Sequence, residues 1–247
     1  MTDTATDNTV RLAKRVAEMR PCSRREAEQY IEGGWVSVDG VVVEEAGARV
    51  TEQQRIDIAA DATLLDIVPV TILLHKPAGF NAGIGGEGAP ALGCLGAGSL
   101  HAASRGPRFL KRHLNGLSLT NPLATMASGL LVYTQDFRVA RKLVDEASRL
   151  EQEIIVEVTG TIIESGLALL NHGLPFNGKP LPPMKVSWQN ETRLRFAVKG
   201  VLPGQIEHMC KMVGLAIVSM KRIRIGRIAM AGLPVGEWRY LQGFERF

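Results

Sequence analysis

Apolar residues recur at helical spacing near the start of the chain. Leu12 and Val16 stand four positions apart within the charged segment 11–17, which predicts a short helix with one apolar face. The same spacing returns in a second segment, which ends at Gly33-Gly34. The sequence therefore predicts two short helices, each with one side buried.

Two local signals mark where the next elements begin. Ser23 and Glu26 form a capping-box pattern, in which the serine hydroxyl accepts an amide hydrogen bond and the glutamate reaches back to the cap. Further on, Asp39-Gly40 separates two valine-rich runs, and such a pair between β-branched runs is a strong hairpin signal. Helix, capped helix and hairpin together predict a compact N-terminal module.

Beyond Pro69 the chain mixes apolar runs, alternating segments and isolated amphipathic segments, with no internal repeat. Such a mixture favours the α+β class with a largely antiparallel sheet. Strands are predicted at residues 70–74, 132–134, 154–158, 185–188, 192–198, 216–218 and 221–227, and helices at 136–150, 167–173 and 205–212. The pattern divides the chain into a flexible tail (1–8), the N-terminal module (9–60), a linker (61–69) and a larger domain (70–247).

Composition narrows the class of partner. The 247 residues are 45% apolar and 22% charged, and a net charge of +4 with a pI near 9.1 favours an anionic partner such as nucleic acid. The three cysteines are far apart and never in Cys-x-x-Cys spacing, so neither a disulfide framework nor a zinc site is expected. The polar N-terminus and the lack of an apolar run of about 20 residues predict a cytoplasmic protein without a membrane span.

Basic residues gather in two places. In the N-terminal module, Arg24 and Arg25 occupy the first turn of the second helix, where cations oppose the helix dipole, so helix stability does not explain them. The glycine-rich segment 80–100 is interpreted as a flexible surface loop. A second basic cluster follows it and consists of Arg105, Arg108, Lys111, Arg112 and His113. Both clusters suit an anionic partner.

The segment from Pro122 to Leu131, Pro-Leu-Ala-Thr-Met-Ala-Ser-Gly-Leu-Leu, resembles the signature of the RNA pseudouridine synthases. That signature runs Arg-Leu-Asp, two variable residues, two small residues and Gly-Leu-Leu. The N-terminal module resembles the RNA-binding module of ribosomal protein S4, and segment 232–239, Gly-Leu-Pro-Val-Gly-Glu-Trp-Arg, is similar to that of large-subunit ribosomal RNA pseudouridine synthases of the RluF type. The resemblance extends from Arg11 to Leu241 and implies the fold of these enzymes.

The resemblance also implies what the site has lost. In the family an aspartate attacks the ribose or base of a flipped-out uridine, the glycosidic bond breaks, and the base rejoins through carbon, without metal or organic cofactor. At the matching positions this chain has Ala124 for the aspartate, Pro122 for an arginine, Ile154 for a tyrosine and Glu207 for the arginine that pairs with the aspartate. These departures agree with one another, because an arginine kept beside a missing carboxylate would be a buried, unpaired charge.

Structured RNA, in particular ribosomal RNA, is the partner that the resemblance implies, with no cofactor and no metal. We expect a monomer, because nothing in the sequence specifies an oligomer interface. In the second basic cluster a solvated charged face is the alternative to RNA contact. The residues expected to contact RNA are Arg11, Lys14, Arg15, Ser23, Arg24, Arg25, Lys76, Arg105, Lys111 and Arg112.

Three interpretations follow, and whether the chain is an enzyme stays open. It is an RNA-binding protein without catalysis on a pseudouridine synthase scaffold, an active ribosomal RNA pseudouridine synthase with another nucleophile, or an inactivated variant of a working enzyme. The first is preferred, because Ala124, Ile154 and Glu207 depart from the family pattern beside an intact basic module. Rescue by Glu207 is disfavoured, since a nucleophile misplaced by about 1 Å loses roughly a hundredfold in rate. The acids that could act instead are Asp136, which is expected to cap its helix, Asp145, Glu146, Glu151 and Glu207.

Overall fold

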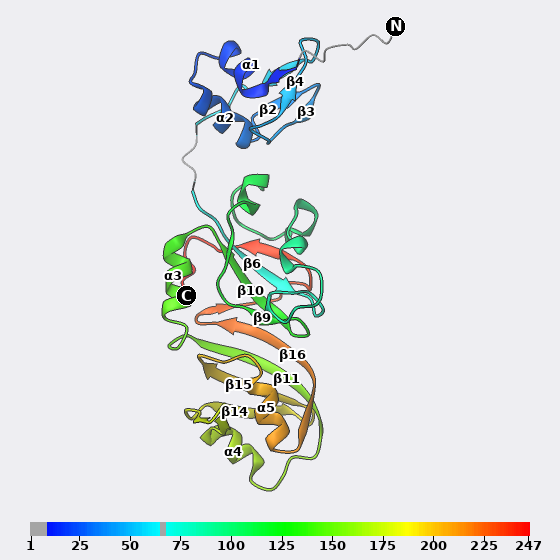
Figure 1. Cartoon of the computed structure of the whole chain (residues 1–247), viewed down its shortest axis with the longest axis vertical. Coiled ribbons are helices and arrows are strands. Elements are labelled where there is room, and N and C mark those ends of the chain that lie inside the picture. The colour runs from blue at the N-terminus through cyan, green and yellow to red at the C-terminus, as the bar shows by residue number, and fades with distance from the viewer. Residues whose placement is uncertain (1–8, 65–67) are drawn as a thin grey trace. The chain divides into compact units, whose positions relative to one another are not determined.

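A computed structural model describes residues 9–64 and 68–247; the predicted tail 1–8 and part of the predicted linker lie outside these residues. The chain divides into two compact units (Figure 1). Unit 1 comprises the N-terminal part, up to Val68, together with Arg108–Asn115, and unit 2 comprises Pro69–Pro107 and Gly116–Phe247. The predicted division assigned residues 108–115 to the larger domain, whereas their contacts place them in unit 1.

Unit 1 begins with the two predicted helices, α1 (Leu12–Met19) and α2 (Arg24–Glu32). The predicted capping box is present: the amide of Glu26 donates to Ser23 Oγ at 3.2 Å, and the amide of Ser23 donates to Glu26 Oε2 at 2.6 Å. Both helices bury their apolar faces in a single core, in which Ile31 is fully buried. The sequence pattern thus identified both helices and the start of the second.

The strands of unit 1 form two small sheets. Asp39 and Gly40, both with positive φ, make the turn of the predicted hairpin. One sheet has the order β3-β2-β5 and the other pairs β1 with β4; β5 was not predicted, because three residues are too few to show a clear alternation. The strands are β1 (Val10–Arg11), β2 (Val36–Val38), β3 (Val41–Val42), β4 (Arg49–Val50) and β5 (Ile56–Ile58).

Residues 108–115 complete unit 1 from a distant part of the sequence. The guanidinium of Arg108 donates to the carbonyl oxygens of Gly33 (2.8 Å) and Gly34 (3.2 Å). Its central carbon also lies 5.4 Å from the centre of the Trp35 ring, in cation–π contact. These hydrogen bonds satisfy carbonyl groups at the C-terminal end of α2, which would otherwise lack partners. Part of the second basic cluster therefore stabilises the module.

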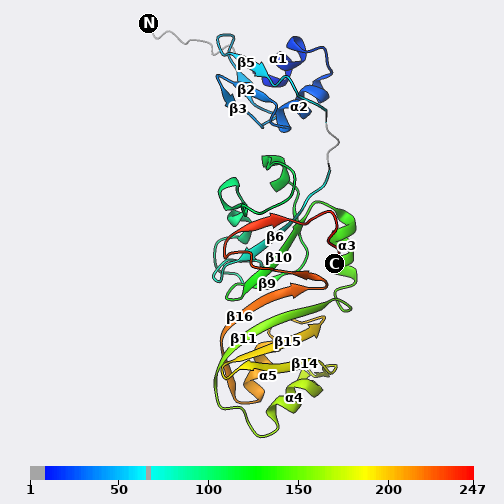
Figure 2. The same ribbon diagram turned by 180° about the vertical axis from the view of Figure 1, so that it is seen from behind.

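Unit 2 is built on one large sheet with the strand order β14-β15-β11-β16-β10-β6-β18 (Figure 2). β10 and β16 run parallel and the other neighbours along this path run antiparallel, which confirms the predicted α+β class with a largely antiparallel sheet. The strands are β6 (Thr71–Lys76), β10 (Ser128–Thr134), β11 (Glu151–Gly160), β14 (Lys185–Asn190), β15 (Arg193–Lys199), β16 (Leu215–Ile225) and β18 (Trp238–Tyr240). The shorter ones are β7 (Gly83–Ile84), β8 (Ser118–Leu119), β9 (Leu123–Ala124), β12 (Pro175–Phe176), β13 (Lys179–Pro180) and β17 (Ile228–Ala229).

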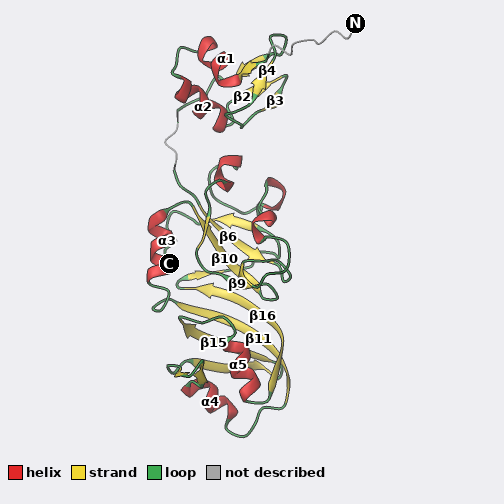
Figure 3. Ribbon diagram, in the orientation of Figure 1, coloured by secondary structure: helices red, strands yellow, loops and turns green. Residues whose placement is uncertain are grey.

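Helices pack on different parts of this sheet (Figure 3). α4 and α5 share a core with β11, β14, β15 and β16, in which Phe196 and Met209 are fully buried. α3 packs through Leu143 into a second core that contains Leu130 of β10, and it ends five residues earlier than predicted. The helices are α3 (Phe137–Asp145), α4 (Gly166–His172) and α5 (Gln205–Met212), with 3₁₀ turns at Ala91–Cys94, Ala97–Ser99 and Lys111–Leu114.

Candidate functional site around Ala124

Ala124 lies at the end of β9, where the chain turns toward β10. β9 pairs in parallel with β7, and the amide of Ala127 donates to the Ala124 carbonyl oxygen at 3.0 Å, which closes a tight turn. The Ala124 side chain is half-buried. Residues 121–127 are called the Ala124 turn below.

The glycine-rich segment 80–100 is packed around this turn. Thr125 donates its amide to β7 at 3.1 Å, and its hydroxyl lies 3.2 Å from the Glu87 carbonyl oxygen. At Gly88, where φ is +92°, a Cβ atom would lie 2.2 Å from the carbonyl oxygen of Gly79, so this close approach requires glycine. Most of the segment is exposed, as expected of a surface loop, but it contains β7 and two 3₁₀ turns, and its residues 84–88 pack against the Ala124 turn.

One row of paired residues crosses the sheet beside the turn. Lys76 on β6, Gly129 on β10, Arg222 on β16, Ile154 on β11 and Phe196 on β15 are successive partners. A Cβ atom on Gly129, whose φ is +113°, would lie 2.2 Å from the Arg222 carbonyl oxygen, so only glycine permits this approach of two strands. Because directly paired residues point to the same face of a sheet, the row brings two cations and Ile154 together on one face.

Arg222 is an interior arginine that holds the Ala124 turn. Its side chain is 2% exposed. The guanidinium donates to the carbonyl oxygens of Leu130 (2.8 Å), Asn121 (2.8 Å) and Pro122 (3.2 Å), and to Gln152 Oε1 at 3.2 Å. Burial lowers the pKa of Arg222 to about 9. Among the described residues no carboxylate pairs with it, so carbonyl and amide oxygens provide all its partners.

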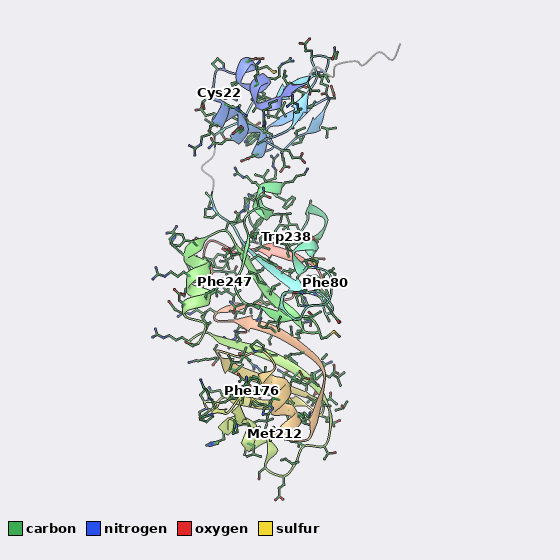
Figure 4. All side chains as sticks on the ribbon, viewed as in Figure 1. Cys22, Phe80, Phe176, Met212, Trp238 and Phe247 are labelled. Atoms are coloured by element: carbon green, nitrogen blue, oxygen red, sulfur yellow. The ribbon has the colours of Figure 1, made fainter. Side chains whose placement is uncertain are left out.

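Lys76 is a second interior cation beside the turn, and its side chain is 0% exposed. Its ammonium group donates to the carbonyl oxygens of Pro77 (2.8 Å), Phe80 (2.7 Å) and Thr125 (3.0 Å); Phe80 is labelled in Figure 4. Burial lowers the pKa of Lys76 to about 8, and the nearby positive charge of Arg222 acts in the same direction. This enclosure contradicts the prediction that Lys76 faces an RNA phosphate.

Asn121 adds an unused hydrogen-bond donor to the site. Its side chain is 6% exposed, and its Oδ1 lies 3.5 Å from Gln152 Nε2. Its Nδ2 has no hydrogen-bond partner within residues 9–64 and 68–247, which is rare for a buried amide. Among the described residues, the site therefore contains two buried cations and one amide donor without a partner, and no carboxylate pairs with them. A site that had once held an acid at position 124 would be left with these groups.

The structure corrects one step of the sequence argument and gives two of the predicted positions different exposure. A buried arginine does remain beside Ala124, because carbonyl oxygens rather than a carboxylate satisfy Arg222. Ile154 is 3% exposed in the core shared with α5, whereas Glu207 is exposed on α5 itself. Sequence reasoning missed Asn121 and Arg222, since only the strand pairing reveals that they meet the turn.

The structure shows other contacts, or exposure to solvent, for the five acids that could replace the nucleophile. Asp136 caps α3, as predicted, by accepting a hydrogen bond from a helix amide at 2.8 Å. Asp145 and Glu151 pair with arginine side chains at 3.2 Å and 2.6 Å. Glu146 and Glu207 are exposed. None of these contacts involves the Ala124 turn.

The predicted RNA contacts lie mostly on the surface of unit 1. Arg11, Lys14, Arg24 and Arg25 are exposed. Lys14 and Arg24 pair with glutamates of their own helices at 3.9 Å and 3.3 Å, and such exposed pairs contribute little and leave the cations accessible. Of the remaining contacts, Arg105 and Lys111 are exposed, Arg15 and Arg112 are half-buried, and Ser23 uses its hydroxyl in the cap of α2.

The described residues show two further features that bear on function. No helix among them is long and apolar enough to cross a membrane. No group of three or more histidine, cysteine, aspartate or glutamate side chains within them is placed to hold a metal ion.

Both units of the chain are similar to known proteins. The family model described as the S4 domain matches residues 10–56. A crystal structure of a pseudouridylate synthase superposes with a TM-score of 0.60, at 18% sequence identity, and covers 94% of this chain and 96% of its own. The fold is thus that of a pseudouridine synthase preceded by an S4 domain.

Sequence relatives make the class more specific. The dual-specificity RNA pseudouridine synthase RluF of Escherichia coli is 26% identical over 97% of this chain and 78% of its own length. Ribosomal large subunit pseudouridine synthase B of Bacillus subtilis is 26% identical over 95% of this chain and 93% of its own. The chain contains an S4 domain and is similar along nearly its whole length to RNA pseudouridine synthases, including RluF.

Proposed function

We propose that this protein binds structured RNA, in particular ribosomal RNA, on a pseudouridine synthase scaffold and does not isomerise uridine. The observation that supports the lack of catalysis most directly is Ala124, which stands where the resemblance places the nucleophilic aspartate. A methyl group has no lone pair, so it can neither attack carbon nor accept a proton. The proposal places the protein in the cytoplasm, with ribosomal RNA, as a monomer.

The surroundings of Ala124 support the same conclusion. The Lys76 ammonium makes three hydrogen bonds to carbonyl oxygens, and the Arg222 guanidinium makes four hydrogen bonds to carbonyl and amide oxygens. The two cations therefore maintain the shape of the Ala124 turn, and among the described residues no carboxylate accepts a hydrogen bond from either of them.

RNA binding is supported by unit 1. It contains the S4 domain and exposes Arg11, Lys14, Arg24 and Arg25. The relatives named above are, by their names, RNA pseudouridine synthases, and we extend that class of partner to this chain. Phosphate contacts of this kind predict that log K falls with log salt by about 0.7–0.9 per phosphate neutralised.

The decisive experiment compares the wild type, Ala124→Asp and Ala124→Asn on ribosomal RNA that lacks pseudouridine. Modification is measured by primer extension after carbodiimide treatment, and RNA binding is measured in parallel. The expected result is binding by all three proteins and no modification by the wild type or by Ala124→Asn. Ala124→Asn is the matched control, because it has the shape of aspartate without its charge.

Each other outcome has a distinct meaning. Modification by the wild type would refute the proposal and would require another nucleophile. Modification by Ala124→Asp alone would show that one lost carboxylate separates this protein from an enzyme. Failure of the wild type to bind RNA at any salt concentration would refute the binding half of the proposal.

A further inference from the structure

The outer face of α3 is unusually exposed for a helix that covers a sheet. Leu143 is buried, whereas Phe137 is 71% and Val144 is 58% exposed. Arg138 and Arg141 have side chains that are 80% and 76% exposed. In Figure 4 the C-terminal residue Phe247 lies beside this helix, and the side chains of α3 project outward from it. An aromatic ring with neighbouring cations is thus presented to solvent.

The charges of α3 only partly favour the helix. Cations are favourable near the C-terminus of a helix and acids near its N-terminus. Asp136 at the cap and Lys142 in the last turn have the favourable sign, whereas Arg138 in the first turn and Asp145 at the end do not. The exposed arginine in the first turn is therefore not explained by helix stability.

The local ion pairs do not occupy these cations. Arg138 lies 3.6 Å from Asp136, and Arg141 lies 3.2 Å from Asp145. The Arg141–Asp145 pair is exposed on both sides and is therefore weak. In the other pair Asp136 is only 23% exposed, but the Arg138 side chain is 80% exposed and stays accessible to another anion. Lys142, which follows Arg141, is also exposed. The groove along this face is lined by Phe137, Arg138, Arg141, Lys142, Asp145 and Glu146.

We propose that the face formed by Phe137, Arg138, Arg141 and Lys142, called the α3 face, binds an unpaired segment of RNA. An unstacked base would lie on the Phe137 ring, and the flanking phosphates would meet the three cations. Aromatic stacking beside a basic groove is the usual chemistry of single-stranded nucleic acid binding. The inference rests on the proposed RNA-binding function and adds a second contact surface to it.

The α3 face is separate from the Ala124 turn. α3 packs through Leu143 into a core with Leu73 and Leu130. These residues are at odd steps along β6 and β10 from Lys76 and Gly129, so they point to the opposite face of the sheet. RNA bound at the α3 face would therefore be held without contact to the vacant nucleophile position.

The test uses the full-length protein and two fluorescent RNAs, a 12-nucleotide single strand and a stem-loop without unpaired flanks. Phe137→Ala is expected to weaken single-strand binding about tenfold, because stacking on the ring is lost. Phe137→Tyr keeps an aromatic face and should bind as the wild type does. Arg138→Glu with Arg141→Glu should reduce the salt slope of single-strand binding by about 1 or more.

Two controls separate this inference from the proposed function. Lys211→Glu reverses one exposed charge on α5 and should leave single-strand binding nearly unchanged. Arg24→Glu with Arg25→Glu alters the module instead and should weaken mainly the stem-loop complex. No variant should melt below the wild type, since the substituted side chains are exposed.

The outcomes are distinguishable. If the α3 variants bind both RNAs as Lys211→Glu does, while the module variant fails, the α3 face is refuted and the proposed function survives. If the wild type binds neither RNA, the proposed function itself fails. If an acidic peptide binds the α3 face and single-stranded RNA does not, the surface exists and the assignment of RNA as its occupant is wrong.

Discussion

The Ala124 turn and the S4 domain use the same residue types for opposite purposes. At the turn, Lys76 and Arg222 are buried, and their donors end on carbonyl oxygens. On the S4 domain, Arg24 and Arg25 are exposed in the first turn of a helix, where their charge is unfavourable. A cation enclosed by backbone fixes local structure, whereas a cation that costs its own helix stability is best explained by a ligand.

Under the proposed function, this difference explains how the scaffold persists without catalysis. The cations beside Ala124 have a structural role through Asn121, Pro122 and Thr125, which does not require a carboxylate at position 124. The proposed RNA contacts of the other unit are independent of that position. Substitutions that remove the buried or the exposed cations therefore test this comparison.

Arg222→Met should produce the largest effect. It leaves the carbonyl groups of Leu130, Asn121 and Pro122 without their buried donor, and each buried acceptor left unsatisfied costs about 1–3 kcal/mol. Urea unfolding measures the loss in free energy of unfolding. Arg193→Met is the matched control, because Arg193 is half exposed and 3.6 Å from its carboxylate partner, so its removal should cost less than about 1 kcal/mol. Equal losses for the two variants would contradict the structural role of Arg222.

Lys76→Met should change the pH dependence of stability. Burial lowers the pKa of Lys76 from 10.5 to about 8, so between these values the unfolded chain binds more protons than the folded one. The free energy of unfolding of the wild type should therefore rise, relative to Lys76→Met, as the pH increases from 8 to 10.5. The shift corresponds to about 3 kcal/mol. A difference between the two proteins that stays constant across this range would show that Lys76 is not buried as a cation.

Ala124→Asp should be stabilising, in contrast to most substitutions at a half-buried position. The new carboxylate would stand in the turn held by Lys76 and Arg222, and opposite charges favour its ionised form. Its folded pKa would lie below its unfolded pKa of about 3.9, so the gain is present above that value and is lost as the pH falls through the folded pKa. We expect about 1 kcal/mol at pH 7 relative to Ala124→Asn, from urea unfolding. No gain over asparagine would mean that the cations do not act at this position.

Local sequence patterns predicted much of the fold, whereas features that depend on contacts between distant residues could not be predicted from them. The capping box of Ser23 and Glu26 and the hairpin turn at Asp39-Gly40 depend on neighbours in sequence, so the pattern identified them. The clamp of Arg108 on the end of α2 joins residues more than seventy positions apart, and no local pattern indicates it.

The site shows the same limit. The motif around Ala124 could be recognised from sequence, because it is one continuous segment. The row that joins Lys76, Arg222 and Ile154 depends on the register of four strands, which no single segment contains. The glycines of segment 80–100 indicated mobility, whereas at Gly88 the missing side chain allows tight backbone packing. A composition that permits flexibility equally permits close approach, and only tertiary contacts distinguish the two.

Arg24→Glu with Arg25→Glu should produce the smallest change in the free energy of unfolding. The sign of that change is informative, because it shows whether these arginines stabilise the domain. Acids in the first turn of α2 interact favourably with the helix dipole, by about 0.3–1 kcal/mol each, less the weak pair that Arg24 makes with Glu28 at 3.3 Å. The variant should therefore be as stable as the wild type or slightly more stable in urea unfolding, while its affinity for structured RNA falls. Arg24→Gln with Arg25→Gln, which removes the charge without reversing it, should lie between the two in both measurements. Stability and affinity that fall together would mean that these arginines support the domain itself, and the contrast with Lys76 and Arg222 would disappear.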